Sequence, residues 1–250
     1  MDDAGELRER IARACRVLGR LNLTKAATGH VSARLPGTDQ IFIRARGPRE
    51  LGVRYTTAAE VIEVDFDGRL VAGPAGLLPP SEVFIHTELY RARSDIQSVI
   101  HMHPPKVVLF TICETPLRPV FGAYDPAAAR LAIGGIPTYE RSIMIRTREL
   151  GRELAQVLGD GSIALMKGHG ITTVHRSIED AALDAIAVNE LATMNYEAAL
   201  LGAPTEISDE DREYFRERQD GGRYEAGDDG KPGERAQAVW NYYVALTEAG

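Results

Sequence analysis

Two histidines separated by a single residue, His101 and His103, have the types and the spacing that suit metal chemistry. Residues 98–102 are mostly apolar and end before a Pro-Pro pair, which predicts a short buried strand. Side chains two positions apart leave a strand on the same face, so the two imidazoles are expected to point together. Converging imidazoles suit a divalent metal, whose nitrogen ligands lie at ~2.0–2.1 Å. On these residues alone, two ordinary half-buried histidines are the alternative.

A third imidazole, that of His169, lies between Gly168 and Gly170. Glycines on both sides allow a close approach of the backbone and leave the ring unobstructed. A third nitrogen donor beside the first two would complete a three-histidine site with open coordination positions, an arrangement typical of catalytic zinc. A turn histidine with no ligand role is the alternative on local grounds.

Glu82 is the carboxylate that best suits a catalytic role. It follows Pro80 and Ser81, where Ser81 is the expected N-cap of a helix over 82–91. A carboxylate in the first turn is favoured by the helix dipole. A plain helix-terminal charge is the alternative.

Two other segments carry polar groups of interest. Residues 40–46 alternate as a strand should and end at Arg46 and Gly47, where a guanidinium suits a carboxylate or phosphate, or simply lies on the surface. The segment Gly29-His30-Val31-Ser32 lies in a turn-prone stretch and by itself predicts a loop.

The remaining elements mix strands and helices without regular alternation, which predicts an α/β fold with a mixed or antiparallel sheet. An Asp67-Gly68 pair predicts a hairpin between strands over 61–66 and 69–72. Further strands are expected over 118–124, 136–139, 162–166 and 171–174. Helices are expected over 6–21, 105–113, 125–131, 147–158, 177–201, 208–219 and 236–247.

Composition excludes several classes of protein. A net charge of −7 over 250 residues argues against binding to nucleic acid, which needs a concentrated basic face. No apolar run reaches the ~18–20 residues of a membrane span, and the acidic first residues lack a signal-peptide pattern. Two cysteines, Cys15 and Cys113, predict buried reduced thiols rather than a disulfide scaffold. We therefore expect a cytoplasmic protein.

Taken together and in chain order, these segments resemble the class II aldolase/adducin family over roughly residues 5 to 202. The matching segments are Gly29-His30-Val31-Ser32, Arg46-Gly47, Asp65-Phe66-Asp67-Gly68, Pro80-Ser81-Glu82, His101-Met102-His103 and His169-Gly170. The resemblance implies an α/β/α sandwich around a largely antiparallel sheet. It also implies a homo-oligomer, often a homotetramer with sites at subunit contacts.

The resemblance assigns roles to the polar residues. His101, His103 and His169 would bind one divalent metal, zinc first and iron, manganese or cobalt as alternatives. Glu82 would be the catalytic acid/base, with a pKa raised toward neutrality by burial. His86 and His175 would not be ligands, and His86, one helical turn from Glu82, would support it.

Departures from the family pattern indicate a branch. The sugar-phosphate enzymes of the family usually carry Asn at the position of His30. They have Ser/Thr-Gly at the position of Arg46-Gly47. They also commonly have a hydroxyl-bearing pair before the glutamate, where this chain has Pro80-Ser81. A phosphate cradle therefore looks depleted, while arginine and histidine suit a carboxylate. The expected substrate-binding residues are Gly29, His30, Arg46, Gly47 and Ser81.

The favoured function is therefore a metal-dependent carbon–carbon lyase that acts through a metal-stabilised enediolate on a small carboxylate. The preferred reaction is decarboxylation of a hydroxylated aromatic or keto acid, with His30 as a candidate proton donor. The alternatives are an aldolase or an epimerase/dehydratase of a sugar (phosphate), and a non-catalytic adducin-like assembly domain. The catalytic domain would span 1–205, followed by a charged helical extension over 206–250 with a mobile loop over 220–234.

Overall fold

The fold is built on one eight-stranded sheet, with strand order β4-β3-β2-β1-β5-β8-β7-β6. Strands β6 and β7 pair in parallel and the other neighbours pair antiparallel. This computed structural model describes residues 3–35, 37–217 and 233–248. The expected α/β fold with a largely antiparallel sheet is confirmed.

The strands are β1 His30–Arg34, β2 Ile41–Arg44, β3 Val61–Val64, β4 Leu70–Ala72, β5 Ser98–Met102, β6 Thr138–Tyr139, β7 Ile163–Met166 and β8 Gly170–His175. The helices are α1 Asp3–Arg20, α2 Val83–Ala92, α3 Pro105–Ile112, α4 Pro126–Gly134, α5 Arg148–Leu158, α6 Ile178–Leu201, α7 Asp209–Glu217 and α8 Glu234–Glu248. Two short 3₁₀ turns, η1 Val53–Tyr55 and η2 Ala58–Glu60, lie between β2 and β3.

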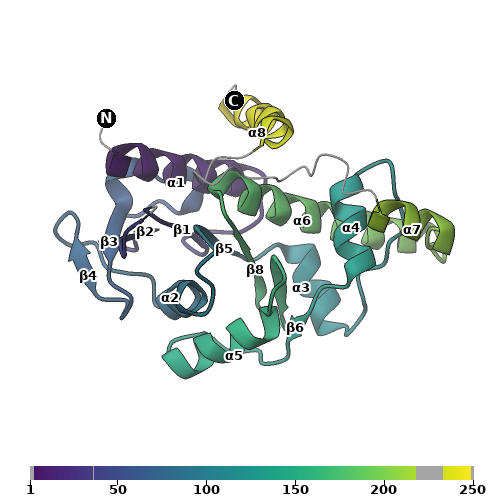
Figure 1. Cartoon of the computed structure of the whole chain (residues 1–250), viewed down its shortest axis with the longest axis horizontal. Coiled ribbons are helices and arrows are strands. Elements are labelled where there is room, and N and C mark those ends of the chain that lie inside the picture. Colours follow the sequence, from purple (N-terminus) through teal and green to yellow (C-terminus); the bar gives the residue numbers. More distant parts are fainter. Residues whose placement is uncertain (1–2, 36, 218–232, 249–250) are drawn as a thin grey trace.

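Helices cover both faces of the sheet, which gives the expected α/β/α sandwich. Helices α1 and α6 lie over one face and α2 and α5 over the other (Figure 1). Strand β2 shows how the two cores separate. Phe42 packs into the core beneath α1, while Ile41 and Ile43 pack into the core beneath α2. Side chains alternate between the faces of a strand, so a strand with both faces covered is apolar throughout.

The helices expected over 147–158 and 177–201 each begin with a side-chain cap at the first residue of the expected range. The hydroxyls of Thr147 and Ser177 accept hydrogen bonds from the first turns of α5 and α6. The prediction of Ser81 as the N-cap of α2 is wrong. Glu82 occupies that position and caps no helical amide, because its carboxylate turns away and accepts a hydrogen bond from the Ile145 amide.

Three other segments differ from expectation. The stretch around His30, predicted as a loop, begins strand β1, which pairs with β2 and β5 in the middle of the sheet. The strand expected over 118–124 is irregular, because the Asn195 side chain bonds both the amide and the carbonyl of Arg118. Cys113 is exposed, whereas Cys15 is buried as expected.

The segment after residue 205 carries helices α7 and α8. Trp240 of α8 is 3% exposed and belongs to the core formed with α1 and α6. Most of the loop expected over 220–234 lies outside the described residues, and the division of the chain at residue 205 stays a prediction. Within the ranges that the structure covers, no helix combines the length and apolar character needed to cross a membrane.

We expect Gly170→Ala to destabilise the fold by ~1–3 kcal/mol, the usual cost of overpacking. A Cβ atom at Gly170 would lie 2.2 Å from the Met102 carbonyl oxygen and 2.8 Å from Cδ2 of His103, where β5 and β8 pair. Urea unfolding measures the change. The control is Gly134→Ala, where a Cβ atom meets nothing within 4 Å. Equal stabilities for the two variants would contradict the prediction.

Candidate metal centre and active site

Four potential metal ligands converge at one end of the central strands. His101 lies in β5 and His103 just beyond its end, while His169 occupies the tight turn between β7 and β8. Glu82 joins them from the start of α2. Donor atoms of these four residues, hereafter the metal-type group, all lie within 4.8 Å of one another. The structure therefore brings together the three histidines and the glutamate that the sequence singled out.

The distances define which atoms face one another. Nε2 of His101 lies 2.8 Å from Nε2 of His103 and 3.9 Å from Oε2 of Glu82, and Nε2 of His169 lies 3.5 Å from the same carboxylate oxygen. Nδ1 of His101 lies 2.9 Å from the Ile171 carbonyl oxygen. This contact assigns the proton of His101 to Nδ1 and leaves a lone pair on Nε2, as metal-binding histidines require.

Burial keeps the imidazoles neutral. It lowers the pKa of His101 well below its usual value, and the neighbouring His103 and His30 act in the same direction. Burial and the nearby His169 also lower the pKa of His103, to about 4, although Glu82 opposes this shift. Neutral imidazoles have a free lone pair, so both residues are ready to act as ligands near neutral pH.

These residues fit a divalent transition metal. Three imidazoles and one carboxylate match the nitrogen and oxygen donors of catalytic zinc and related ions. The second ring nitrogen of His169, Nδ1, is buried and has no hydrogen-bond partner among the residues that the structure describes. No thiolate contributes to the group.

The carboxylate of Glu82 is held in a defined orientation. Its Oε1 accepts a hydrogen bond of 2.8 Å from the Ile145 amide, so Oε2 is the oxygen that faces the histidines. Burial raises the pKa of Glu82, but the contact with His169 and the Ile145 amide outweigh burial and lower it overall. The expectation of a raised pKa is therefore wrong. Glu82 is ionised in the site.

A cavity of about 360 Å³ opens beside this group. Four of the five expected substrate-binding residues line this cavity, namely Gly29, His30, Arg46 and Ser81. The other lining residues are Ala27, Thr28, Arg44, Glu50, Pro80, Glu82, His103, Met144 and His169. Gly47 does not line the cavity, and its amide lies 3.4 Å from Oε1 of Glu50. Arg46 is exposed at the mouth, where its Nε donates to the Pro79 carbonyl.

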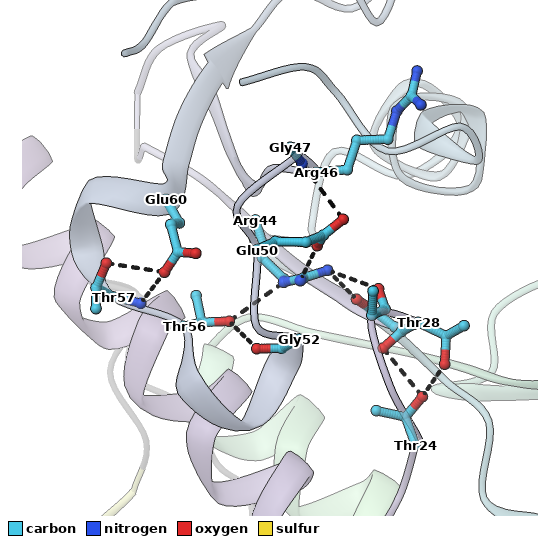
Figure 2. A network of polar contacts seen from close by, with 12 residues as sticks. Thr24, Thr28, Arg44, Arg46, Gly47, Glu50, Gly52, Thr56, Thr57 and Glu60 are labelled. Atoms are coloured by element: carbon cyan, nitrogen blue, oxygen red, sulfur yellow. Dashed lines mark hydrogen bonds and ion pairs between the residues drawn. The ribbon is translucent and has the colours of Figure 1, made fainter. Parts of the chain in front are cut away.

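Arg44 is a second arginine of the cavity, and it is not among the residues that the sequence predicts to bind substrate. Its side chain is only 4% exposed. The guanidinium donates to the carbonyls of Ala27 and Gly29 and pairs with Glu50 (Figure 2). Arg44 therefore fixes the cavity wall, with its charge balanced by Glu50, while the Arg46 side chain extends away from this network (Figure 2).

His86 has different partners from those expected. Its ring nitrogens lie 2.6 Å from Nδ1 of His30 and 2.6 Å from Oγ of Ser32, so it supports His30 rather than Glu82. The two partners lie more than 50 positions away along the chain, and no local pattern in the sequence indicates either contact. His175 bonds Asp184 instead of joining the metal-type group.

Comparisons with known proteins agree with this architecture. Residues 9–196 match the family described as Class II Aldolase and Adducin N-terminal domain. The chain is 40% identical over 198 residues to a 3,4-dihydroxyphthalate decarboxylase from Arthrobacter keyseri, covering 78% of this chain and 79% of that protein. It is 36% identical over 241 residues to a protein of the same name from Rhodococcus jostii, covering 94% and 93% respectively.

Among solved structures, an aldolase II superfamily protein from Pseudomonas syringae superposes with a TM-score of 0.84. The alignment covers 100% of this chain and 94% of that one, at 23% sequence identity. This likeness shows the shared fold.

The chain belongs to the class II aldolase and adducin family. Within that family it resembles the decarboxylase-type members, as the sequence departures predicted. It is an enzyme.

We expect the purified protein to hold about one divalent metal ion per chain, and the His101→Ala/His103→Ala variant to lose it. Removing two of the four donors leaves too few ligands for tight binding. Elemental analysis measures the metal. The control is His175→Gln, which changes a histidine outside the group and is expected to keep the ion. Metal retained by the double variant would contradict the assignment.

We expect the stability of the protein to fall as the pH is lowered from about 7 toward about 5, with His86 as a major cause. Burial lowers the pKa of His86 to about 3, whereas an unfolded histidine titrates near ~6.5. Between these two pKa values, His86 binds a proton in the unfolded chain but not in the folded chain. The contribution of His86 to the free energy of unfolding is therefore complete above the pKa of the unfolded histidine and is lost progressively as the pH falls below it. Urea unfolding of wild type and His86→Gln should show a flatter pH dependence in the variant, and parallel curves would contradict this origin.

Proposed function

We propose that this protein is a divalent-metal-dependent decarboxylase of a hydroxylated aromatic acid. The observation that carries the proposal is one cavity that is lined both by metal-type donors and by the exposed cationic side chain of Arg46. The relatives from Arthrobacter keyseri and Rhodococcus jostii, at 40% and 36% identity, are named 3,4-dihydroxyphthalate decarboxylases. A dihydroxyphthalate is therefore the first substrate to test.

The chemistry of such a substrate suits the two ends of the cavity. 3,4-Dihydroxyphthalate has two neighbouring hydroxyls and two neighbouring carboxylates. A divalent cation held by His101, His103 and His169 would supply Lewis-acid stabilisation of negative charge on oxygen. At the mouth, the guanidinium of Arg46 suits a carboxylate through paired charge-assisted hydrogen bonds. Ser81 and Thr28 also line the cavity and offer hydroxyl groups.

Glu82 is suited to move the proton that the reaction needs. Its Oε1 is held by the Ile145 amide, so the ionised Oε2 accepts a proton from a substrate hydroxyl. The bond between the ring carbon and one carboxylate then breaks, CO₂ leaves, and the electron pair stays on the ring. Oε2 returns its proton to that carbon, and a solvent proton restores the hydroxyl. The products are CO₂ and a dihydroxybenzoate.

The alternative reactions use the same donors and differ at the mouth of the cavity. A sugar-phosphate aldolase, epimerase or dehydratase needs a site for a phosphate. Hydroxyl-bearing residues that would form this site are replaced here by Arg46 and Pro80. A non-catalytic assembly domain has no use for the metal histidines, all of which are present and converge. Both alternatives are therefore less well supported than decarboxylation.

We expect the metal-loaded protein to release CO₂ from 3,4-dihydroxyphthalate, and Glu82→Gln to lower kcat by ~10²–10⁴-fold through loss of the proton carrier. CO₂ release and product chromatography measure the reaction. Elemental analysis of the variant separates loss of the proton carrier from loss of the metal. Cleavage of L-fuculose 1-phosphate, with no CO₂ from any hydroxylated aromatic acid, would overturn the proposal in favour of an aldolase.

Arg46→Ala should raise KM for the aromatic acid by ~10–100-fold, the usual effect of removing a hydrogen-bonded charge. The matched control is Arg69→Ala, because the Arg69 side chain is 77% exposed and does not line the cavity. Steady-state kinetics measure both. An unchanged KM in Arg46→Ala would show that the carboxylate is held elsewhere.

The homotetramer and the cytoplasmic location stay predictions. The identity of the metal, with zinc preferred over iron, manganese and cobalt, also stays a prediction.

A further inference from the structure

A buried chain of four polar side chains leads from the cavity wall into the core beneath α2. Nδ1 of His30 lies 2.6 Å from Nε2 of His86, Nδ1 of His86 lies 2.6 Å from Oγ of Ser32, and that oxygen lies 2.8 Å from the Tyr90 hydroxyl. None of the four residues is more than 6% exposed. The reaction steps above use none of these contacts.

The secondary structure explains why the four side chains meet. His30 and Ser32 are two positions apart on β1 and leave the same face. His86 and Tyr90 are four positions apart on α2 and share one side of the helix. His30 also stands opposite His101 across the β1–β5 pair, with their ring centroids 5.1 Å apart. The chain therefore ends beside the metal-type group.

The contacts favour one direction for the hydrogen bonds. The Ser32 hydroxyl has one proton, and the acceptor at 2.6 Å, Nδ1 of His86, is much closer than the Val99 carbonyl at 3.4 Å. Ser32 then accepts from the Tyr90 hydroxyl. A neutral His86 that accepts at Nδ1 has its proton on Nε2 and donates it to Nδ1 of His30. His30 must then carry its own proton on Nε2.

We propose that His86 and Ser32 are positioning residues that hold His30 in the Nε2–H tautomer, so that the cavity wall presents a hydrogen-bond donor to an oxygen of the substrate. The substrate part of this inference rests on the proposed function. His30 lines the cavity and its Nδ1 faces the core, so Nε2 is the nitrogen left for the substrate. The opposite tautomer would present a lone pair there and repel a carboxylate or a deprotonated hydroxyl.

The tautomer is tested without substrate by ¹⁵N NMR of histidine-labelled protein, with His30→Gln to assign the signals. We expect a protonated Nε2 and an unprotonated Nδ1 at His30. In Ser32→Ala, His86 loses the donor to its Nδ1, so the share of His30 with a proton on Nδ1 should rise. A wild-type His30 with its proton on Nδ1 would overturn the inference.

Steady-state kinetics test the consequence. Ser32→Ala should raise KM by ~10–100-fold, as changes in supporting residues commonly do, with a smaller change in kcat, because the donor contacts the bound substrate before and during reaction. Ser98→Ala is the matched control. Ser98 is as fully buried as Ser32 and lies on the neighbouring strand. Its hydroxyl donates to the backbone carbonyl of Ser32 and bonds no other group among the described residues. The KM of Ser98→Ala and the NMR signals of its His30 should equal those of the wild-type protein.

The outcomes separate this inference from the proposed function. A protein that releases no CO₂ from aromatic acids but has the Nε2–H tautomer supports the assignment and contradicts the proposed function alone. An active protein with the reversed tautomer overturns the assignment alone. Equal changes in KM for Ser32→Ala and Ser98→Ala, accompanied by equal losses in thermal unfolding temperature, would show a merely structural role and overturn it as well.

Discussion

The convergence of the metal-type group depends on the antiparallel pairing of β5 with its two neighbouring strands. Strand β5 lies between β1 and β8, and its register sets His101 opposite His30 on one side and opposite Thr172 on the other. The same pairing brings the His169 turn, which leads into β8, to the end of β5 where His103 lies. Backbone hydrogen bonds at the centre of a sheet covered on both faces are shielded from water and hold their register firmly. His101 itself lies inside β5, and the pairing of β5 with β8 brings the short segments that carry His103 and His169 to the same end of the sheet.

Backbone groups at the edge of the site complete this arrangement. The Ile171 carbonyl determines which nitrogen of His101 is free, and the Ile145 amide determines which oxygen of Glu82 is free. Neither contact depends on the side chain of the residue that provides it. The orientation of these two side chains thus follows from the course of the chain in β8 and in the segment before α5. Supporting contacts of this kind tune the basicity of metal ligands.

The sequence was informative where a pattern is local. The spacing of His101 and His103 predicts a shared strand face, and the glycines beside His169 predict an accessible ring. Apolar or alternating runs of residues predict most strands. Long-range contacts were not accessible in the same way. The partners of His86 and Arg44 come from segments that meet only in the folded chain. The pKa of Glu82 was misjudged because burial was foreseen, whereas the Ile145 amide and the contact with His169 were not. Strand β1 was missed because its polar residues point into a buried network instead of into solvent.

The two arginines of the cavity differ in their burial and in their partners. Arg44 is buried, neutralised by Glu50 and bonded to the backbone around Gly29, so its replacement disturbs the fold. Arg46 is exposed, and its Nε bonds a backbone carbonyl at the mouth. A change of residue at position 46 alters the charge that an incoming molecule meets while leaving the packed wall intact. In evolutionary terms, the preference of this scaffold for one anion over another can drift through single substitutions at its entrance, with the metal-type group and the core left unchanged.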